Sequence, residues 1–303
     1  MPGVPAYGAT ALALLAAAAW GGGDFTGGMA ARRASPFLTV ALANGLSLLL
    51  LLAAVFWRGT QPPSTRTALL GVLCGIVAGL SVALFYEALA LGKMGLSAAI
   101  AGLLSAAIPV AFSFVTEGLP RPIQILGFFV AGVAIWMIAS APRGGTHPRG
   151  LGLATLAGTG FGLYFVLLKL AGAGGVAWSL ISMRVGSVML ATVVCVFQGI
   201  VRRRAKQALA FPEEGAEAQK TRASLLAPAF VGLVIATCLL DTGGNLSYIM
   251  ATRAGRLDVA AVLASLYPAG TILLAAWLLK ERTTRTLTLG MALALGAVIL
   301  IAL

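Results

Sequence analysis

The chain has 303 residues, 59% of them hydrophobic and 10% charged, and its formal net charge is +12. So little polar surface cannot cover a water-soluble body of this length, and the composition therefore excludes an ordinary soluble protein and indicates a polytopic membrane protein. The basic residues stand at the edges of apolar stretches, where lipid headgroups attract them, so the charge does not indicate nucleic-acid binding.

Ten apolar stretches follow one another, each close to the length of about 20 residues that a helix needs to cross a bilayer. Strand-like alternation is absent, and a backbone in lipid must satisfy its hydrogen bonds within helices or closed barrels. We therefore predict an all-α membrane protein with ten transmembrane helices. They are expected near residues 7–30, 36–57, 67–91, 95–116, 122–141, 150–171, 175–200, 223–252, 256–279 and 285–303. Because no Lys or Arg precedes the first span, we expect it to stay in the membrane as a helix.

The first span contains an acidic residue within a glycine-rich run over residues 21–28. Glycines let a membrane helix approach a neighbour closely, and Trp20 lies four residues before Asp24, on the same helical face. We predict that Trp20 and Asp24 contact the substrate. An interfacial position beside Arg32 and Arg33 is the alternative for Asp24.

Two further signals lie in the third and fourth spans. Tyr86 ends the third span and is a predicted substrate contact, whereas its neighbour Glu87 fits a boundary ion pair with Lys93. Pro109 lies inside the fourth span, as Pro268 does in the ninth. Prolines free backbone carbonyls, and helix breaks in corresponding spans point to a transport site. We therefore predict helix breaks or gating at Pro109 and Pro268.

Residues that bind metals or carry out catalysis are sparse. Cys74, Cys195 and Cys238 all fall within predicted spans, and an odd buried number indicates packing residues, not disulfides or a metal site. His147, the single histidine, lies in a loop. The sequence has no zinc-protease, nucleophile-elbow or phosphate-binding motif. We therefore expect no enzymatic activity, no metal and no cofactor.

The eighth span carries the strongest candidate for a cavity wall. Asp241, Asn245 and Tyr248 follow one another at spacings of four and three residues, so they share one helical face. A charge at the bilayer centre costs roughly 2.5–3.5 kcal/mol, so Asp241 needs a partner or a function. Gly243 and Gly244 lie beside it, and we predict a helix break or gating at these glycines as well. The alternative role for Asp241 is to cap the helix broken there and to contact only the backbone.

Arg184 lies about ten residues into the seventh span, too deep to reach the surface with ease. It fits two roles that the sequence leaves open: holding a substrate carboxylate with two parallel hydrogen bonds, or pairing internally with Asp241 or Asp24. Tyr164 in the sixth span and Tyr267, next to the proline of the ninth span, complete the predicted substrate contacts.

The spans divide into two sets of five, residues 1–145 and 146–303, with a polar loop at 202–222 in the second set. The first spans align at an offset of 140 residues and the later ones at about 162. Each half ends with a proline, a Glu-containing turn and a glycine. An odd number of spans per repeat implies that the halves have inverted topology, which suits alternating access.

Several motifs, in this order, resemble the EamA-type ten-helix branch of the drug/metabolite transporter superfamily. They are Trp20-Gly21, Tyr86, Tyr248, Pro268 and the Lys280-Glu281-Arg282 turn before Gly290, and they extend over nearly the whole chain. The first half departs from the pattern, with Thr116-Glu117-Gly118 at the corresponding turn. The resemblance implies a bacterial inner-membrane carrier that moves amino acids or other small metabolites, typically outward.

Within that class, one deep arginine with a few carboxylates and several aromatic residues favours a small zwitterion such as an amino acid. A cationic drug, a nucleoside or a sugar is the alternative substrate, and a receptor or scaffold would not require inverted repeats. Odd-numbered loops hold fourteen Lys and Arg residues against five in even-numbered loops, which predicts that both termini face outward. The expected partners are the substrate and the lipid bilayer, and a monomer is compatible with the sequence.

Overall fold

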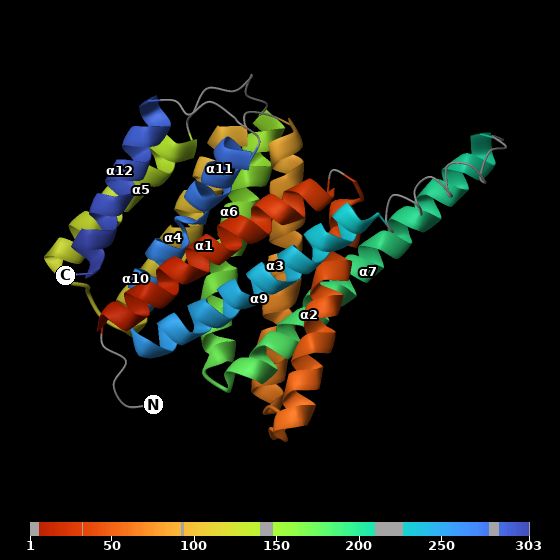
Figure 1. The fold of residues 1–303 in the computed structure, drawn as a ribbon, viewed down its shortest axis with the longest axis horizontal. Coiled ribbons are helices and arrows are strands. Elements are labelled where there is room, and N and C mark those ends of the chain that lie inside the picture. The colour runs from red at the N-terminus through yellow and green to blue at the C-terminus, as the bar shows by residue number, and fades with distance from the viewer. Residues whose placement is uncertain are drawn as a thin grey trace.

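The computed structural model describes residues 6–31, 33–91, 94–139, 148–209, 227–278 and 285–302. All regular structure in these ranges is helical (Figure 1), which confirms the predicted all-α class. The helices are α1 (Ala6–Ala31), α2 (Pro36–Arg58), α3 (Thr65–Leu91), α4 (Met94–Thr116), α5 (Pro122–Ala139), α6 (Pro148–Gly172), α7 (Val176–Leu209), α9 (Pro228–Ala254), α10 (Leu257–Ala264), α11 (Tyr267–Leu278) and α12 (Arg285–Ala302). The Lys280-Glu281-Arg282 turn, Lys93 and His147 lie outside the described residues, as do the side chains of Tyr86 and Glu87.

The outer surface of the helices suits lipid. Large apolar side chains point outward on several helices, including Leu49 at 66% exposure, Phe129 at 71% and Phe197 at 65%. Among the described residues, five helical segments are long and apolar enough to cross a membrane. They are Pro36–Arg58, Thr65–Phe85, Gly152–Gly172, Val176–Ile200 and Pro228–Ala254. The chain is thus a multi-pass membrane protein.

The ninth predicted span is divided. We expected one span over residues 256–279 with a helix break at Pro268, and α10 ends at Ala264 while α11 begins at Tyr267, next to that proline. Turn-type bonds join the two helices, since the Leu266 amide donates to the Leu263 carbonyl at 3.2 Å. Pro268 is the second residue of α11, a position at which a helix tolerates the missing N–H.

The structure contradicts the other expected breaks. Pro109 lies inside the continuous helix α4, and Gly243 and Gly244 lie inside the continuous helix α9. Packing explains the glycine at position 244, because a Cβ atom there would lie 2.5 Å from Cδ1 of Trp20. This glycine therefore lets α9 approach the indole of α1 closely, which is a common use of small residues in membrane helices.

The helices of the two halves pack reciprocally. Helix α1 lies along α9, and α3 lies along α6, so the first helix of each half contacts the third helix of the other. Likewise α2 packs against α7, and α5 against α12. An internal duplication with approximate two-fold symmetry produces this kind of matching.

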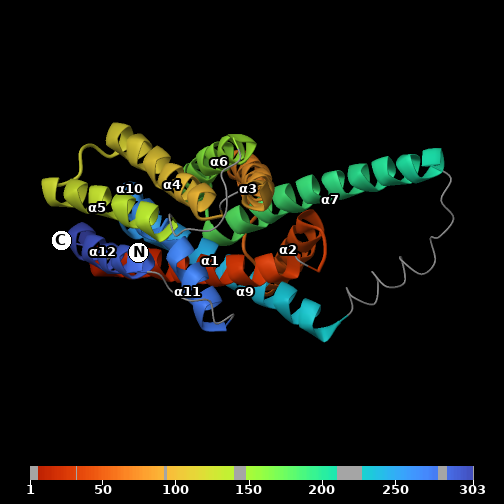
Figure 2. The ribbon, with the colours of Figure 1, turned by 90° about the horizontal axis from the view of Figure 1, so that it is seen from above.

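Close helix contacts hold the second half against the first. At the crossing of α3 and α7, the Ser187 hydroxyl donates to the Gly75 carbonyl at 2.9 Å. A side chain on Gly75 would collide with the main-chain carbonyl of Met183, so only glycine permits this approach. Beyond this crossing α7 continues outward past the other helices, as Figure 2 shows.

Candidate functional site

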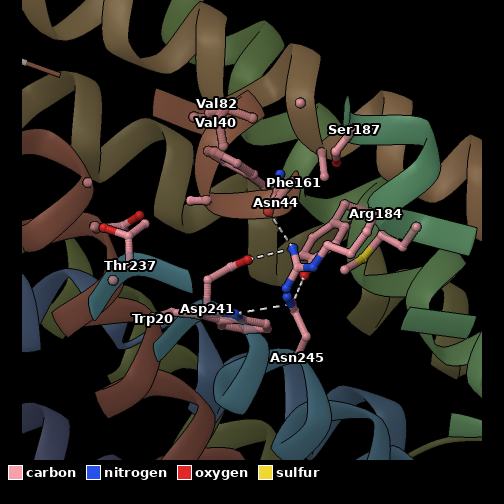
Figure 3. Close-up of a pocket in the computed structure, with 18 of the residues that line it drawn as sticks. Trp20, Val40, Asn44, Val82, Phe161, Arg184, Ser187, Thr237, Asp241 and Asn245 are labelled. Carbon is pink, nitrogen blue, oxygen red and sulfur yellow. Dashed lines mark hydrogen bonds and ion pairs between the residues drawn. The ribbon is translucent and has the colours of Figure 1, made fainter. Parts of the chain in front are cut away.

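A cavity of about 140 Å³ lies between the two halves, and it receives side chains from both. Figure 3 shows its centre, where Arg184 of α7 faces Asn44 of α2 and Asp241 of α9. The lining residues are Trp20, Gly23, Asp24, Gly27, Thr39, Val40, Ala43, Asn44, Ala78, Gly79, Val82, Phe161, Tyr164, Phe165, Met183, Arg184, Ser187, Thr237, Asp241, Asn245 and Tyr267. Aliphatic and aromatic walls surround a few polar groups, as in most small-molecule sites.

Arg184 is the most fully bonded side chain of the cavity. Only 2% of it is exposed, and its Nη1 lies 2.6 Å from a carboxylate oxygen of Asp241. The guanidinium also donates to Asn44 at 2.8 Å, to Ser47 at 2.9 Å and to Thr242 at 3.2 Å. Each of the three guanidinium nitrogens thus donates one hydrogen bond, and Nη1 also pairs with the Asp241 carboxylate.

These contacts answer the question that the sequence left open about Arg184. The side chain pairs internally with Asp241, and its donors join α7 to α2 and α9. Asn44 and Arg184 stand at equivalent places in the two halves, 140 residues apart, and they touch because their helices are the central pair. Arg184 therefore holds together the three helices α2, α7 and α9 at the cavity wall.

The aromatic floor of the cavity is built around Trp20. Its indole is stacked on Phe165 with ring centroids 5.2 Å apart, and it lies 5.5 Å from the ring of Tyr248. The indole N–H donates to the carboxamide oxygen of Asn245 at 3.2 Å, and the Tyr164 hydroxyl donates to the same oxygen. Two donors at one oxygen fix the orientation of the Asn245 amide.

Asp24 differs from the other charged residues of the cavity. It lines the cavity and is half-buried, yet within the described part of the chain its carboxylate forms no hydrogen bond and no ion pair. Its neighbour Gly23 lies against α9, where a Cβ would sit 3.5 Å from the Asp241 amide nitrogen. Asp24 and Asp241 thus belong to one local region of the cavity.

A second polar side chain lacks a partner. The hydroxyl of Thr39 on α2 is buried, with 3% of the residue exposed, and it has no hydrogen-bond partner among the described residues. It lines the same cavity as Asp24. Buried polar groups are nearly always hydrogen-bonded, so Thr39 marks a place for a polar ligand atom or water.

Most of the predicted substrate contacts lie at the cavity. Trp20, Asp24, Tyr164, Arg184, Asp241, Asn245 and Tyr267 all line it. Tyr248 does not: it is fully buried behind Trp20 and donates to the Phe165 carbonyl at 3.4 Å. The side chain of Tyr86 lies outside the described residues. Our expectation that the face of Asp241 and Asn245 extends to Tyr248 is therefore wrong, because α9 turns this ring into the aromatic core.

The lining residues of α2 were not among the predicted substrate contacts. Thr39 and Asn44 are polar residues within an otherwise apolar span, and this was the available signal. Phe161 and Phe165 of α6 were also missed. Apolar aromatic residues in a membrane helix carry no signal that separates a lining position from a lipid-facing one.

A second polar cluster, here called the Glu117 network, consists of Glu117, Lys169, Arg256 and Asp258. Lys169 pairs with the Glu117 carboxylate, which also accepts a hydrogen bond from the Leu257 amide at 3.0 Å. Arg256 pairs with the buried Asp258 at 2.8 Å and donates to the main-chain carbonyl of Glu117 at 3.2 Å. The network thus ties the end of α4 to α6 and to the start of α10.

The network and the cavity lie at different levels along the helices. Gly255, next to Arg256, packs against Ala9 near the start of α1, whereas the cavity-lining residues of α1 begin at Trp20 and run toward its C-terminal end. On α6, however, Lys169 of the network follows the lining residue Phe165 by four residues, which corresponds to about 6 Å along the helix. The Glu117 network therefore lies next to one end of the cavity.

The comparisons with known proteins agree with this architecture. No curated protein matches the chain. One solved structure, described only as "Crystal structure of protein", has a similar fold, with a TM-score of 0.71 at 18% sequence identity over 96% of this chain and 95% of that chain. The model of the EamA-like transporter family matches twice, over residues 8–140 and 148–303. Since the two matches span nearly the whole sequence, the chain belongs to the EamA-like transporter family and is a membrane transporter, not an enzyme.

Proposed function

We propose that this transporter moves small metabolites, of the size of amino acids, across the bacterial inner membrane by alternating access of its two halves. The observation that carries the proposal is a polar cavity lined by both halves and holding charged side chains within apolar helices. Charged groups at such a depth are costly and mark substrate pathways. Sites at the interface of repeats are typical of secondary transporters.

The size of the cavity favours a small substrate. Pockets for drug-sized ligands have volumes of about 300–1,000 Å³, whereas this cavity has about 140 Å³. A multidrug transporter is therefore the weaker alternative. Export is the direction that we propose, in line with the resemblance described above.

Closure at one end supports alternating access. The Glu117 network joins a residue of the first half to three residues of the second half, next to one end of the cavity. In our proposal this network forms the closed gate of the present conformation. The opposite conformation requires that the network separate while the other end of the cavity closes.

Substrate counterflow tests the proposed transport. Purified protein in liposomes is loaded with an unlabelled mixture of amino acids, amines, nucleosides and sugars, and uptake of each labelled compound is compared with that of protein-free liposomes. We expect accumulation of at least one amino acid or amine. A folded, monodisperse protein that exchanges no compound of the panel would contradict transport of small metabolites.

A further inference from the structure

We propose that the cavity selects a small cationic amine, that Asp24 is the residue that holds the ammonium group, and that a substrate carboxylate is not required. This inference rests on the proposed function and names the substrate class of the same cavity. It also departs from the zwitterion favoured by the sequence, because that expectation depended on a free Arg184.

Arg184 is already engaged within the protein. A carboxylate is held by two parallel N–H bonds from one guanidinium, but each of the three guanidinium nitrogens already donates a hydrogen bond, to Ser47, Asn44 or Thr242. Nη1 is also paired with the Asp241 carboxylate. The bidentate geometry that would recognise the carboxylate of an amino acid is therefore absent in this arrangement.

One of the charged side chains that line the cavity has no ion-pair partner among the described residues. Among the described lining residues the ionisable acids and bases are Asp24, Asp241 and Arg184, and one acid is paired with the base. The remaining carboxyl group, that of Asp24, has no cation paired with it among the described residues. An unpaired carboxylate in a half-buried, apolar setting is costly, and a bound cation offsets that cost.

The other groups that line the cavity with Asp24 suit an ammonium ion. An ammonium ion offers up to three donors and favours the faces of aromatic rings. Trp20, Phe161 and Tyr164 line the same cavity, and the unpartnered Thr39 hydroxyl can accept a hydrogen bond from a donor. Carboxylate, hydroxyl and aromatic rings together form a receptor for a protonated amine.

Matched pairs of ligands test this selection. Isothermal titration of the purified protein at neutral pH is carried out with phenethylamine and L-phenylalanine, with isoamylamine and L-leucine, and with cadaverine and L-lysine. The members of each pair differ only in the α-carboxylate. We expect at least one amine to bind, and to bind at least tenfold more tightly than its parent amino acid.

The Asp24→Asn variant tests the role of this residue, with Glu213→Gln as the control, because the control makes the same chemical change in the polar loop. We expect D24N to lower amine affinity at least tenfold, with E213Q unchanged. Amino acids that bind as tightly as their amines, no binding by any amine, or a D24N variant with wild-type affinity would overturn the inference. If amino acids still exchange in counterflow, the proposed transport stands while the amine selectivity fails.

Discussion

Arg184 shows how one residue governs the stability of the site. Its guanidinium links α7 to Ser47 on α2 and to Thr242 and Asp241 on α9. Removing one partner from a buried charge pair leaves the other charge uncompensated, and this costs more than the pair contributes in net terms. The Asp241 side chain is 34% exposed, so part of the cost is screened by solvent.

We expect Arg184→Ala to lower the stability of the folded protein by about 1–3 kcal/mol. Arg184→Lys should be intermediate, because an ammonium group has three donors and cannot reproduce the planar fork. The measurement is the thermal unfolding temperature of detergent-purified protein. The double variant R184A/D241A should recover part of the loss, since no charge is then left alone. Equal unfolding temperatures for wild type and R184A would contradict a structural role.

At the level of the helices, neighbouring glycines on α9 have different environments. A Cβ on Gly244 would lie 2.5 Å from the Trp20 ring, whereas a Cβ on Gly243 would meet nothing within 4 Å. The contact positions the indole that donates to Asn245. The crossing of α1 and α9 therefore sets the floor of the cavity.

This contrast gives a matched pair of variants. We expect Gly244→Ala to displace Trp20 and to weaken ligand binding about tenfold, through loss of a hydrogen bond worth about 1 kcal/mol together with the aromatic packing. Gly243→Ala should bind as wild type does. Ligand-dependent tryptophan fluorescence checks both variants. Identical titrations for the two would show that the close contact does not position the indole.

The sequence predicted the helices well because membrane spans depend on apolar length, which is a local property. The prediction failed where packing against neighbouring helices decides the structure. Pro268 and Pro109 gave the same signal, yet only the helix beside Pro268 divides, where Ser265 contacts Ser105 of α4 at 3.1 Å, whereas α4 continues through Pro109. Tyr248 shares a helical face with Asn245, yet packing against Trp20 and Phe165 turns it away from the cavity.

The same distinction applies to the charged residues of the site. Asp24, Arg184 and Asp241, which were chosen as predicted substrate contacts because charges within a span are costly, all line the cavity. Which acid pairs with the arginine depends on how α7 meets α1, α2 and α9, and no spacing in the sequence encodes that choice. The free carboxylate at Asp24 therefore became apparent only from the packed helices.

At the scale of the whole molecule, the ends of the cavity differ. The Glu117 carboxylate of the first half accepts the Leu257 amide of the second half, so it caps the first turn of α10 from a different helix. Lys169 holds the other oxygen of that carboxylate. The short helix α10 is thus anchored at its start by the opposite half, and it ends at Ser265, where turn-type bonds connect it to α11.

This arrangement predicts that Glu117 controls access from the closed end. We expect Glu117→Ala to remove charge-assisted bonds worth about 1.5–3 kcal/mol and to raise the population of the separated state roughly tenfold to a hundredfold. A cysteine at Ser265 reports on it, because this residue is fully buried in the closed form. The three native cysteines are first replaced with alanine.

Labelling of Ser265→Cys by a charged thiol reagent in liposomes should then be slow in the parent protein and at least tenfold faster with Glu117→Ala. Glu117→Gln should lie between them, because an amide oxygen still accepts the Leu257 N–H while the pair with Lys169 loses its charge. Glu213→Gln serves as the control, because it makes the same chemical change at a residue that is not one of the four in the network. If all variants react at the parent rate, the network only stabilises the fold, and the gate must lie elsewhere along α4 and α10. If Glu117→Ala speeds labelling and bound substrate slows it again, the closed end is coupled to the cavity. A ligand shifts a conformational equilibrium only by its difference in affinity for the two states.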